Sequence, residues 1–208
     1  MQDPVDLRAH YRMVFLKGEI IFRQGEVARY WYELTSGSVR LCHYFGDGRR
    51  QITHFPVAGE VFGFERGLRR VSAEALADLT LVRHDIQEAS EGGMLPSHGM
   101  QCALEAADRN LSLFSHSDAC HRLAAFLLDF RHRTQSDERV KLPMCRQDLA
   151  DHLGLTMYTV SRSMSQLVKR GLLVADNPVE LRIVDRQALE AFVGVDWVEP
   201  ELTAQLIA

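Results

Sequence analysis

A group of hydrogen-bonding side chains lies within residues 142–173, at spacings that place its members on one face of a helix. Hydroxyl, guanidinium and amide groups of this kind exchange hydrogen bonds with the base edges and phosphates of a nucleic acid. The group consists of Tyr158, Thr159, Ser161, Arg162, Gln166 and Lys169. A helix carrying this face would present a polar, basic surface to DNA.

The elements that must position this face can also be predicted from spacing. An apolar stripe at i, i+4, i+7 and i+8 on the same helix is expected to be buried. Its members are Val160, Met164, Leu167 and Val168. Upstream, Gly154 suits the left-handed end of one helix, and Thr156 is a good N-cap for the next. The spacing Ala150, Gly154, Val160 is typical of a helix-turn-helix, whose second helix enters the DNA major groove. The alternative is an ordinary helical hairpin.

A two-stranded wing follows this helix pair. Gly171 can end the second helix, and the apolar residues 172–174 and the alternating residues 180–184 predict two strands. Asp176-Asn177-Pro178 supplies the turn between them. Helix-turn-helix and wing together predict a winged helix.

Composition sets the class of protein. The 208 residues suffice for one large domain or two small ones, and 46% hydrophobic with 25% charged residues is ordinary for a globular protein. No apolar run approaches the roughly 18 residues of a membrane span, and the N-terminus lacks the hydrophobic region of a signal peptide. We therefore expect a cytoplasmic protein with no membrane partner.

The net charge of −4 is unevenly distributed along the chain. Residues 122–186 hold 11 Lys and Arg against 8 Asp and Glu, whereas the remainder holds 13 against 20. The basic excess lies in the segment with the helix-turn-helix, so the acidic whole-chain charge does not argue against DNA binding.

The chain from Met13 to Val82 reads as short strands separated by glycine-bearing turns. The apolar or alternating runs are residues 19–22, 31–34, 38–44 and 51–55, and Gly46-Asp47-Gly48 is a clear turn. Many short strands at this spacing predict a jelly-roll sandwich, called the β-roll below. With the helices that follow, the predicted fold class is α+β.

A longer helix is predicted from Ser97 to Phe114, with apolar residues in alternating steps of four and three. These residues are Met100, Leu104, Ala107, Leu111 and Phe114. Such a narrow seam is typical of a coiled coil, and it predicts a homodimer. A two-fold dimer would present two recognition helices about one DNA turn apart. The alternative is a helix that packs on the β-roll.

Further helices complete the chain. Ser117 or Asp118 can cap a helix that runs to Arg133, a polar connection spans residues 134–139, and Asp185 can cap a helix ending near Val193. We expect a β-roll over residues 1–96, a dimerisation helix over 97–117 and a winged-helix domain over 118–208.

The cysteines predict neither a metal site nor a cofactor. Cys42, Cys102, Cys120 and Cys145 are scattered without a CxxC pair, which supports neither zinc binding nor a disulfide framework. Cys145 begins the first helix of the helix-turn-helix, where the helix dipole favours a thiolate. Oxidation there would add bulk or negative charge beside DNA, so Cys145 is a candidate redox switch. The alternative is an ordinary thiol.

Several segments, in order, resemble the CRP/FNR family of bacterial transcription regulators. They are IFRQGE (21–26), SGSVR (36–40), DGRRQITHF (47–55), GEVFGFERG (59–67), RLAAFLLDF (122–130) and the helix-turn-helix. The combination is most similar to the FixK-like branch. The resemblance implies a β-roll like that of cyclic-nucleotide-binding domains and a homodimer on a two-fold symmetric DNA site. It also implies activation by contact with RNA polymerase, and control of microaerobic, nitrogen-oxide or nitrogen-fixation genes.

The sensing residues of the family are not matched. Members that bind cyclic AMP use a Glu on the ribose and an Arg-Ser pair on the phosphate, where this chain has Phe64 and, before Ser72, Val71. We expect no cyclic AMP site, because the phosphate would lack its charged partner. The iron–sulfur cluster of FNR-type sensors needs clustered N-terminal cysteines, and none precedes Cys42.

The recognition motif of the FNR/FixK branch is Glu-x-x-Ser-Arg. Ser161 and Arg162 match it, whereas Tyr158 stands at the Glu position. By resemblance, Arg162 would bind guanine or a phosphate and Ser161 a base. Tyr158 would offer a hydroxyl and a ring edge in place of an acceptor for cytosine; the alternative is a partly packed surface aromatic. The residues expected on phosphates are Thr156, Thr159 and Arg146.

Other classes of function can be compared with this one. DNA binding could depend on a small effector other than cyclic AMP, and a nucleotide-sized β-roll pocket with buried polar groups would favour that alternative. No Ser/His/Asp order, HExxH or phosphate-binding glycine loop supports an enzyme. The sequence therefore predicts a sequence-specific DNA-binding regulator and not an enzyme.

Overall fold

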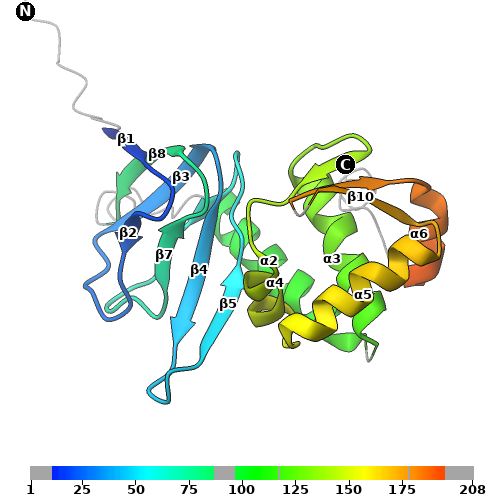
Figure 1. Cartoon of the computed structure of the whole chain (residues 1–208). Coiled ribbons are helices and arrows are strands. Elements are labelled where there is room, and N and C mark those ends of the chain that lie inside the picture. Colours follow the sequence, from blue (N-terminus) through cyan, green and yellow to red (C-terminus); the bar gives the residue numbers. More distant parts are fainter. Residues whose placement is uncertain (1–10, 87–96, 117, 178, 195–208) are drawn as a thin grey trace, which may run out of the picture. The chain divides into compact units, whose positions relative to one another are not determined.

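The computed structural model describes residues 11–86, 97–116, 118–177 and 179–194, apart from the side chains of residues 97–100 and 102. The chain divides into two compact units, residues 1–108 and 109–208, and the division falls inside helix α2 (Figure 1). The C-terminal tail from residue 195 lies outside the described residues. Among the described helices, none combines the length and the apolar character needed to cross a membrane.

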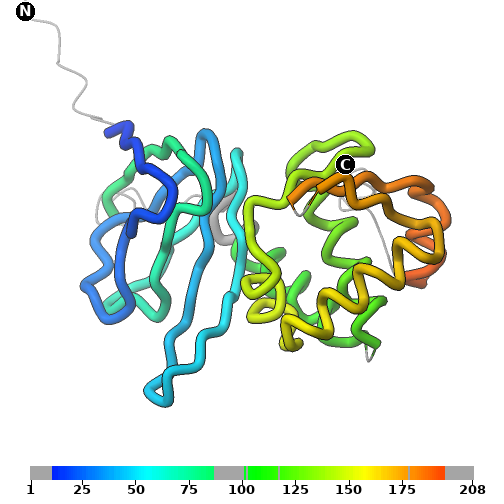
Figure 2. Tube along the Cα trace, viewed as in Figure 1, coloured from blue at the N-terminus to red at the C-terminus, as the bar shows by residue number. Residues whose placement is uncertain are grey.

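The described part of the first unit contains eight strands in two antiparallel sheets, which confirms the predicted β-roll. The strands are β1 Tyr11–Phe15, β2 Ile20–Phe22, β3 Tyr30–Ser36, β4 Val39–Tyr44, β5 Arg50–His54, β6 Val61–Phe62, β7 Ser72–Ala75 and β8 Leu79–Asp85. One sheet has the order β1-β8-β3-β6 and the other β2-β7-β4-β5. Figure 2 follows the β4–β5 hairpin, in cyan, around the predicted turn at residues 46–48.

The two sheets enclose an apolar core, as the alternation along the strands predicts. Its buried members are Phe22, Tyr32, Leu34, Val39, Phe62, Ala73, Ala75, Leu79 and Leu81. Gly37 makes the β3–β4 turn with a φ of 87°, and a Cβ there would lie 2.5 Å from the Cβ of Leu79. Only glycine fits this approach of the turn to β8.

The second unit is a helical domain with a small sheet. Its elements are α3 Ala119–Arg133, β9 Arg139–Lys141, α4 Arg146–Leu153, α5 Met157–Lys169, β10 Leu173–Asn177, β11 Glu180–Ile183 and α6 Arg186–Val193, while α2 Ser97–Ser115 leads into it. Asp118 and Asp185 cap α3 and α6 by accepting backbone N–H hydrogen bonds, as predicted. The core is built on α3, whose Leu123, Phe126 and Phe130 are at most 1% exposed.

The wing has a third strand that the sequence pattern did not predict. Residues 134–139 were expected to be a polar connection, but Arg139 begins β9, which pairs antiparallel with β11. Val140 lies opposite Leu181, and both are 1% exposed. A single buried side chain in a polar segment gives little periodic signal, so this strand depends on its partner.

The buried stripe of α5 differs from the prediction at one position. Val160, Met164 and Leu167 are buried, but Val168 is 37% exposed and Ser163 is 3% exposed. The reason is the packing of α5 on α3, where the sulfur of Cys120 approaches the carbonyl oxygen of Ser163 at 3.8 Å. The stripe therefore turns toward Ser163 and away from Val168.

Candidate DNA-binding surface

The helix pair α4–α5 is held by local interactions that the sequence predicted. Gly154 ends α4 in the left-handed conformation with a φ of 64°, and its N–H donates to the carbonyl of Ala150. Leu149, Ala150, Leu153 and Val160 are fully buried where the two helices cross. The small residue, the glycine and the valine thus do what a helix-turn-helix requires of them.

The start of α5 is fixed by two threonines. Thr156 caps the helix by accepting the N–H of Thr159 at 3.1 Å, as predicted. The two hydroxyl oxygens also lie 2.8 Å apart in a hydrogen bond. Each hydroxyl has one proton to donate, so this bond uses one of the two donors. One O–H of the pair remains for a phosphate.

The outer face of α5 carries the residues that the sequence analysis predicts to contact DNA bases. Tyr158 is 75% exposed, and Ser161 and Arg162 are also exposed on the same face. Within the described residues, Tyr158 and Arg162 have no hydrogen-bond or ion-pair partner. Ser165 and Lys169 extend this exposed face toward the end of the helix. The side chains of Tyr158 and Arg162 are therefore available to another molecule, whereas the Ser165 hydroxyl donates to the carbonyl of Ser161 at 3.0 Å and the Gln166 side chain accepts from the Cys120 thiol at 2.7 Å.

Arg146 lies in the first turn of α4 and is half-buried. Its Nη1 atom is buried and has no hydrogen-bond partner among the described residues. Burial lowers the pKa of Arg146 below the ordinary value of arginine. A guanidinium stays charged in proteins, and a partly desolvated one with an unused donor gains from an anion.

Cys145 is the N-cap residue of α4 and is an exposed free thiol, whereas Cys42 and Cys120 are buried. The backbone N–H of Cys145 donates to the carboxylate of Asp148 at 3.1 Å. Cys102 lies outside the described side chains. In the described part of the chain, no three His, Cys, Asp or Glu side chains are placed to hold a metal ion.

The seam of α2 is exposed along the part that the structure describes. Leu104 is 64% exposed, Leu111 70% and Phe114 44%, and Ala107 is exposed as well. The side chain of Met100 lies outside the described residues. Leu113, which belongs to another face of the helix, is 6% exposed.

Arg122 connects the end of α2 to the helix-turn-helix, and the sequence analysis did not single it out. Its guanidinium donates to the carbonyl of Leu153 at 2.7 Å and to that of His116 at 2.8 Å. It also lies over the ring of Phe114, 5.5 Å from the centroid. A Cβ on Gly154 would lie 3.3 Å from that same ring. Both atoms that accept hydrogen bonds from Arg122 are backbone carbonyl oxygens, so no residue type in the sequence marks them. The position of Arg122 at the start of α3 is the only signal of its role in the sequence.

In the β-roll, the positions that would bind cyclic AMP in the family are engaged within the chain. Phe64 stacks on Trp31 with ring centroids 5.1 Å apart. The Ser72 hydroxyl is buried and accepts the N–H of Gln24 at 2.9 Å. The nearest arginine to the Gly63 turn, Arg69, is buried and donates to the carbonyls of Gly63 and Tyr30.

Two family models match the chain. One is described as a Crp-like helix-turn-helix domain and matches residues 121–192, which include α4, α5 and the wing. The other is described as a cyclic nucleotide-binding domain and matches residues 12–90, which include the β-roll.

Known proteins match most of the chain. The nitrogen fixation regulation protein FixK of Rhizobium meliloti (strain 1021) is 36% identical over 179 residues, which are 84% of this chain and 83% of that protein. The FixK protein of Azorhizobium caulinodans is 38% identical over 192 residues, 85% of this chain and 76% of its own. The solved structure of FixK2 from Bradyrhizobium japonicum has a TM-score of 0.78 and 31% identity, and the match covers 92% of this chain and 99% of that one.

Proposed function

The chain belongs to the CRP/FNR family of DNA-binding transcription regulators, on its FixK-like branch, and we propose that it acts as a homodimer on a two-fold symmetric DNA site. Its relatives are regulators and not enzymes, in agreement with the prediction. We further propose three functional parts: a β-roll over residues 1–96, a dimerisation helix over 97–117 and a DNA-binding domain over 118–208.

The proposed base contacts come from the exposed face of α5. Arg162 reads guanine through O6 and N7, Ser161 contacts a neighbouring base, and Tyr158 contacts a base edge with its hydroxyl or ring. The observation that carries this assignment is that Tyr158 and Arg162 are exposed and have no partner within the described chain. Phosphates are contacted by Arg146 and by the one free hydroxyl donor of the Thr156–Thr159 pair.

The proposed dimer forms along α2. Leu104 and Leu111 are separated by one heptad and are exposed, so a second copy of the helix would bury both. Arg122 supports a link from this seam to the DNA-binding surface, because it bonds the ends of α2 and α4. A two-fold axis along the seam would place two α5 helices on half-sites one DNA turn apart.

The proposed biological role follows the relatives. Two of them are named nitrogen fixation regulation proteins, and we infer a role in nitrogen-fixation, nitrogen-oxide or microaerobic gene control. The regulator would act in the cytoplasm as an activator that contacts RNA polymerase.

Selection from random duplex DNA tests this function. Purified, ligand-free protein should enrich a palindrome with half-sites about 10 base pairs apart, centre to centre. The Arg162→Ala protein serves as the control and should enrich the same palindrome more weakly, with less preference at the base pair that Arg162 contacts. Failure of the unaltered protein both with and without cell extract would contradict the proposal. Enrichment only with extract would favour the effector-dependent alternative.

We also propose Cys145 as a redox switch, because its thiol is exposed at the start of α4. Peroxide should weaken DNA binding of the unaltered protein, because oxidation adds bulk or charge where phosphate approaches. The Cys145→Ser protein should keep its affinity in the same electrophoretic mobility assay. Equal weakening of both proteins would contradict the switch.

A further inference from the structure

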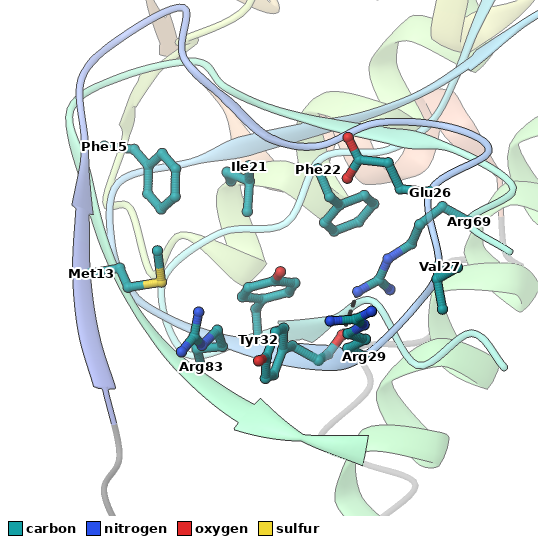
Figure 3. Close-up of a pocket in the computed structure, with 11 residues that line it drawn as sticks. Met13, Phe15, Ile21, Phe22, Glu26, Val27, Arg29, Tyr32, Arg69 and Arg83 are labelled. Atoms are coloured by element: carbon teal, nitrogen blue, oxygen red, sulfur yellow. Dashed lines mark hydrogen bonds between the residues drawn. The ribbon is translucent and has the colours of Figure 1, made fainter. Parts of the chain in front are cut away.

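The β-roll contains a cavity of about 240 Å³ that neither the DNA-binding surface nor the α2 seam uses (Figure 3). It opens between β1, β2, β3 and β8. One wall is apolar and comes from Phe15, Ile21 and Phe22, with Met13 beside them. Tyr32, whose ring stacks on that of Phe22 with centroids 5.6 Å apart, also lines the cavity, together with Arg83 and the exposed Arg29.

The cavity lining is cationic. Arg29, Arg69 and Arg83 contribute three guanidinium groups, against the single carboxylate of Glu26. In Figure 3, Glu26 lies beyond the ring of Phe22, whereas Arg29 and Arg83 lie on the Tyr32 side. The lining is therefore apolar at Met13, Phe15 and Ile21 and positively charged at Arg29 and Arg83, while Arg69 lies over the ring of Phe22, 4.0 Å from its centroid.

Within the described residues, two of these cations have no carboxylate partner. Arg69 is committed to the carbonyls of Gly63 and Tyr30 and lies 3.6 Å from a carboxylate oxygen of Glu65. Arg83 stacks over the ring of Tyr30 at 4.2 Å, and no described residue forms an ion pair with it or with Arg29. Arg83 is held by this packing, whereas Arg29 is exposed. A guanidinium that lacks a counter-ion is suited to a carboxylate.

Tyr32 adds a neutral donor to the cavity lining. Burial raises the pKa of Tyr32, an effect that nearby Arg69 and Arg83 oppose without cancelling. Its hydroxyl therefore keeps its proton at physiological pH and can donate to an anion.

The size of the cavity limits the ligand. Pockets for drug-sized molecules occupy about 300–1,000 Å³, so a space of about 240 Å³ suits a single ring with one acidic group. The cavity is also distinct from the positions that correspond to the family's nucleotide residues, because Phe64, Val71 and Ser72 do not line it.

We propose that this cavity is a binding site for a small aromatic carboxylate. The ring lies against Phe15 and Ile21, and the carboxylate bonds with Arg83 and Arg29, which supply the positive charge. This site goes beyond the proposed function, since binding here is measured without DNA. Its failure would leave the DNA-binding proposal standing.

Benzoate is the probe, and Met13 is the reporter inside the cavity. In protein labelled with ¹³C at the methionine methyl groups, benzoate should shift the Met13 signal saturably through its ring current. Benzyl alcohol, which keeps the ring, and acetate, which keeps the charge, should each bind at least ten-fold more weakly. The Met13→Leu protein assigns the signal among the seven methionines.

Two variants test the chemistry of the site. Arg83→Met removes the charge and keeps the apolar stem, and should weaken benzoate at least ten-fold. Arg12→Met is the matched control, because Arg12 is exposed on neighbouring β1 and does not line the cavity. Ile21→Phe fills the cavity and should abolish the benzoate-induced shift of the Met13 signal. This variant provides the test if the Arg83→Met protein fails to fold. The proposal would be overturned if benzoate left the Met13 signal unchanged. It would also be overturned if the folded Arg83→Met, Ile21→Phe and Arg12→Met proteins bound benzoate with equal affinity.

Discussion

Arg40 and Arg69 of the β-roll and Arg162 of α5 are used in opposite ways. In the β-roll, Arg40 bonds with the carboxylate of Glu74, and buried Arg69 bonds with two backbone carbonyls. On α5, Arg162 is exposed and has no partner among the described residues. A partner offsets the cost of burying a charge, whereas an unpartnered charge keeps its capacity for a ligand. The difference separates side chains that stabilise the fold from side chains that are available to a ligand.

The largest effect on DNA binding is expected from a charge placed in the exposed apolar seam of α2. Leu111→Glu places a charge in the α2 seam, and the dimer should dissociate because two copies of Glu would face each other across it. Sedimentation should show a monomer, and DNA affinity should fall by a factor on the order of 1,000 or more, since one recognition helix is lost.

Leu16 provides the control for this change. It is 60% exposed on the β-roll, so Leu16→Glu makes the same substitution at a comparably exposed leucine outside the seam. The Leu16 variant should remain a dimer. A Leu111→Glu protein that sediments as a dimer would show that α2 is not the interface.

The next effect concerns the unpartnered arginine of α5. Arg162→Ala should cost about 1–3 kcal/mol per half-site, because one good base contact is worth that much. Competition binding to the selected palindrome measures the loss. Arg186 is the matched control in the same unit, because it is paired with Glu190, and Arg186→Ala should change affinity little. Equal losses in the two variants would argue for a general charge effect.

A partnered arginine should affect stability instead. Arg69→Met removes a charged donor from the partly buried carbonyls of Gly63 and Tyr30, and should lower the free energy of unfolding by about 2–4 kcal/mol. Urea unfolding of this variant can be compared with Arg70→Met, whose side chain is 85% exposed. DNA affinity below the unfolding transition should be unchanged in both. A reduced DNA affinity of the folded Arg69→Met protein would contradict the distinction between arginines that stabilise the fold and arginines that contact DNA.

The smallest effect is a pH dependence at Glu74. Burial raises its pKa, but hydrogen bonds from Tyr44 and Arg40 outweigh burial and hold the pKa of Glu74 below its usual range. The stabilisation is therefore present above the unfolded pKa of about 4.3 and is lost as pH falls through the folded value. Urea unfolding of the Glu74→Gln protein between about pH 5 and 3 should show a weaker pH dependence than the unaltered protein. Equal slopes would mean that the Arg40–Glu74 bond does not contribute.

Local signals in the sequence predicted much of this molecule. The roles of residues at helix ends can be predicted from spacing, because these residues act through neighbours a few positions away. They are Gly154, Thr156, Asp118 and Asp185. The β-roll was predictable because its turns recur with glycine between alternating runs.

The features that escaped prediction depend on contacts between distant residues. Strand β9 exists because Val140 meets Leu181, and Ser163 is buried because α3 lies against it. Arg122 acts on backbone carbonyls, which every residue possesses, so no residue type marks its target. The β-roll cavity combines strands from both ends of the domain, and its charge emerges only when they are assembled.

The Arg122 link between α2 and α4 has a consequence for how salt acts on this protein. Both of its acceptors are carbonyl oxygens, which do not titrate, and the contact is partly buried, where counter-ions screen weakly. Added electrolyte should therefore leave the spacing of the recognition helices unchanged and act on the phosphate contacts alone. The slope of log affinity against log salt concentration, divided by about −0.9, then gives the number of phosphates that the proposed dimer neutralises.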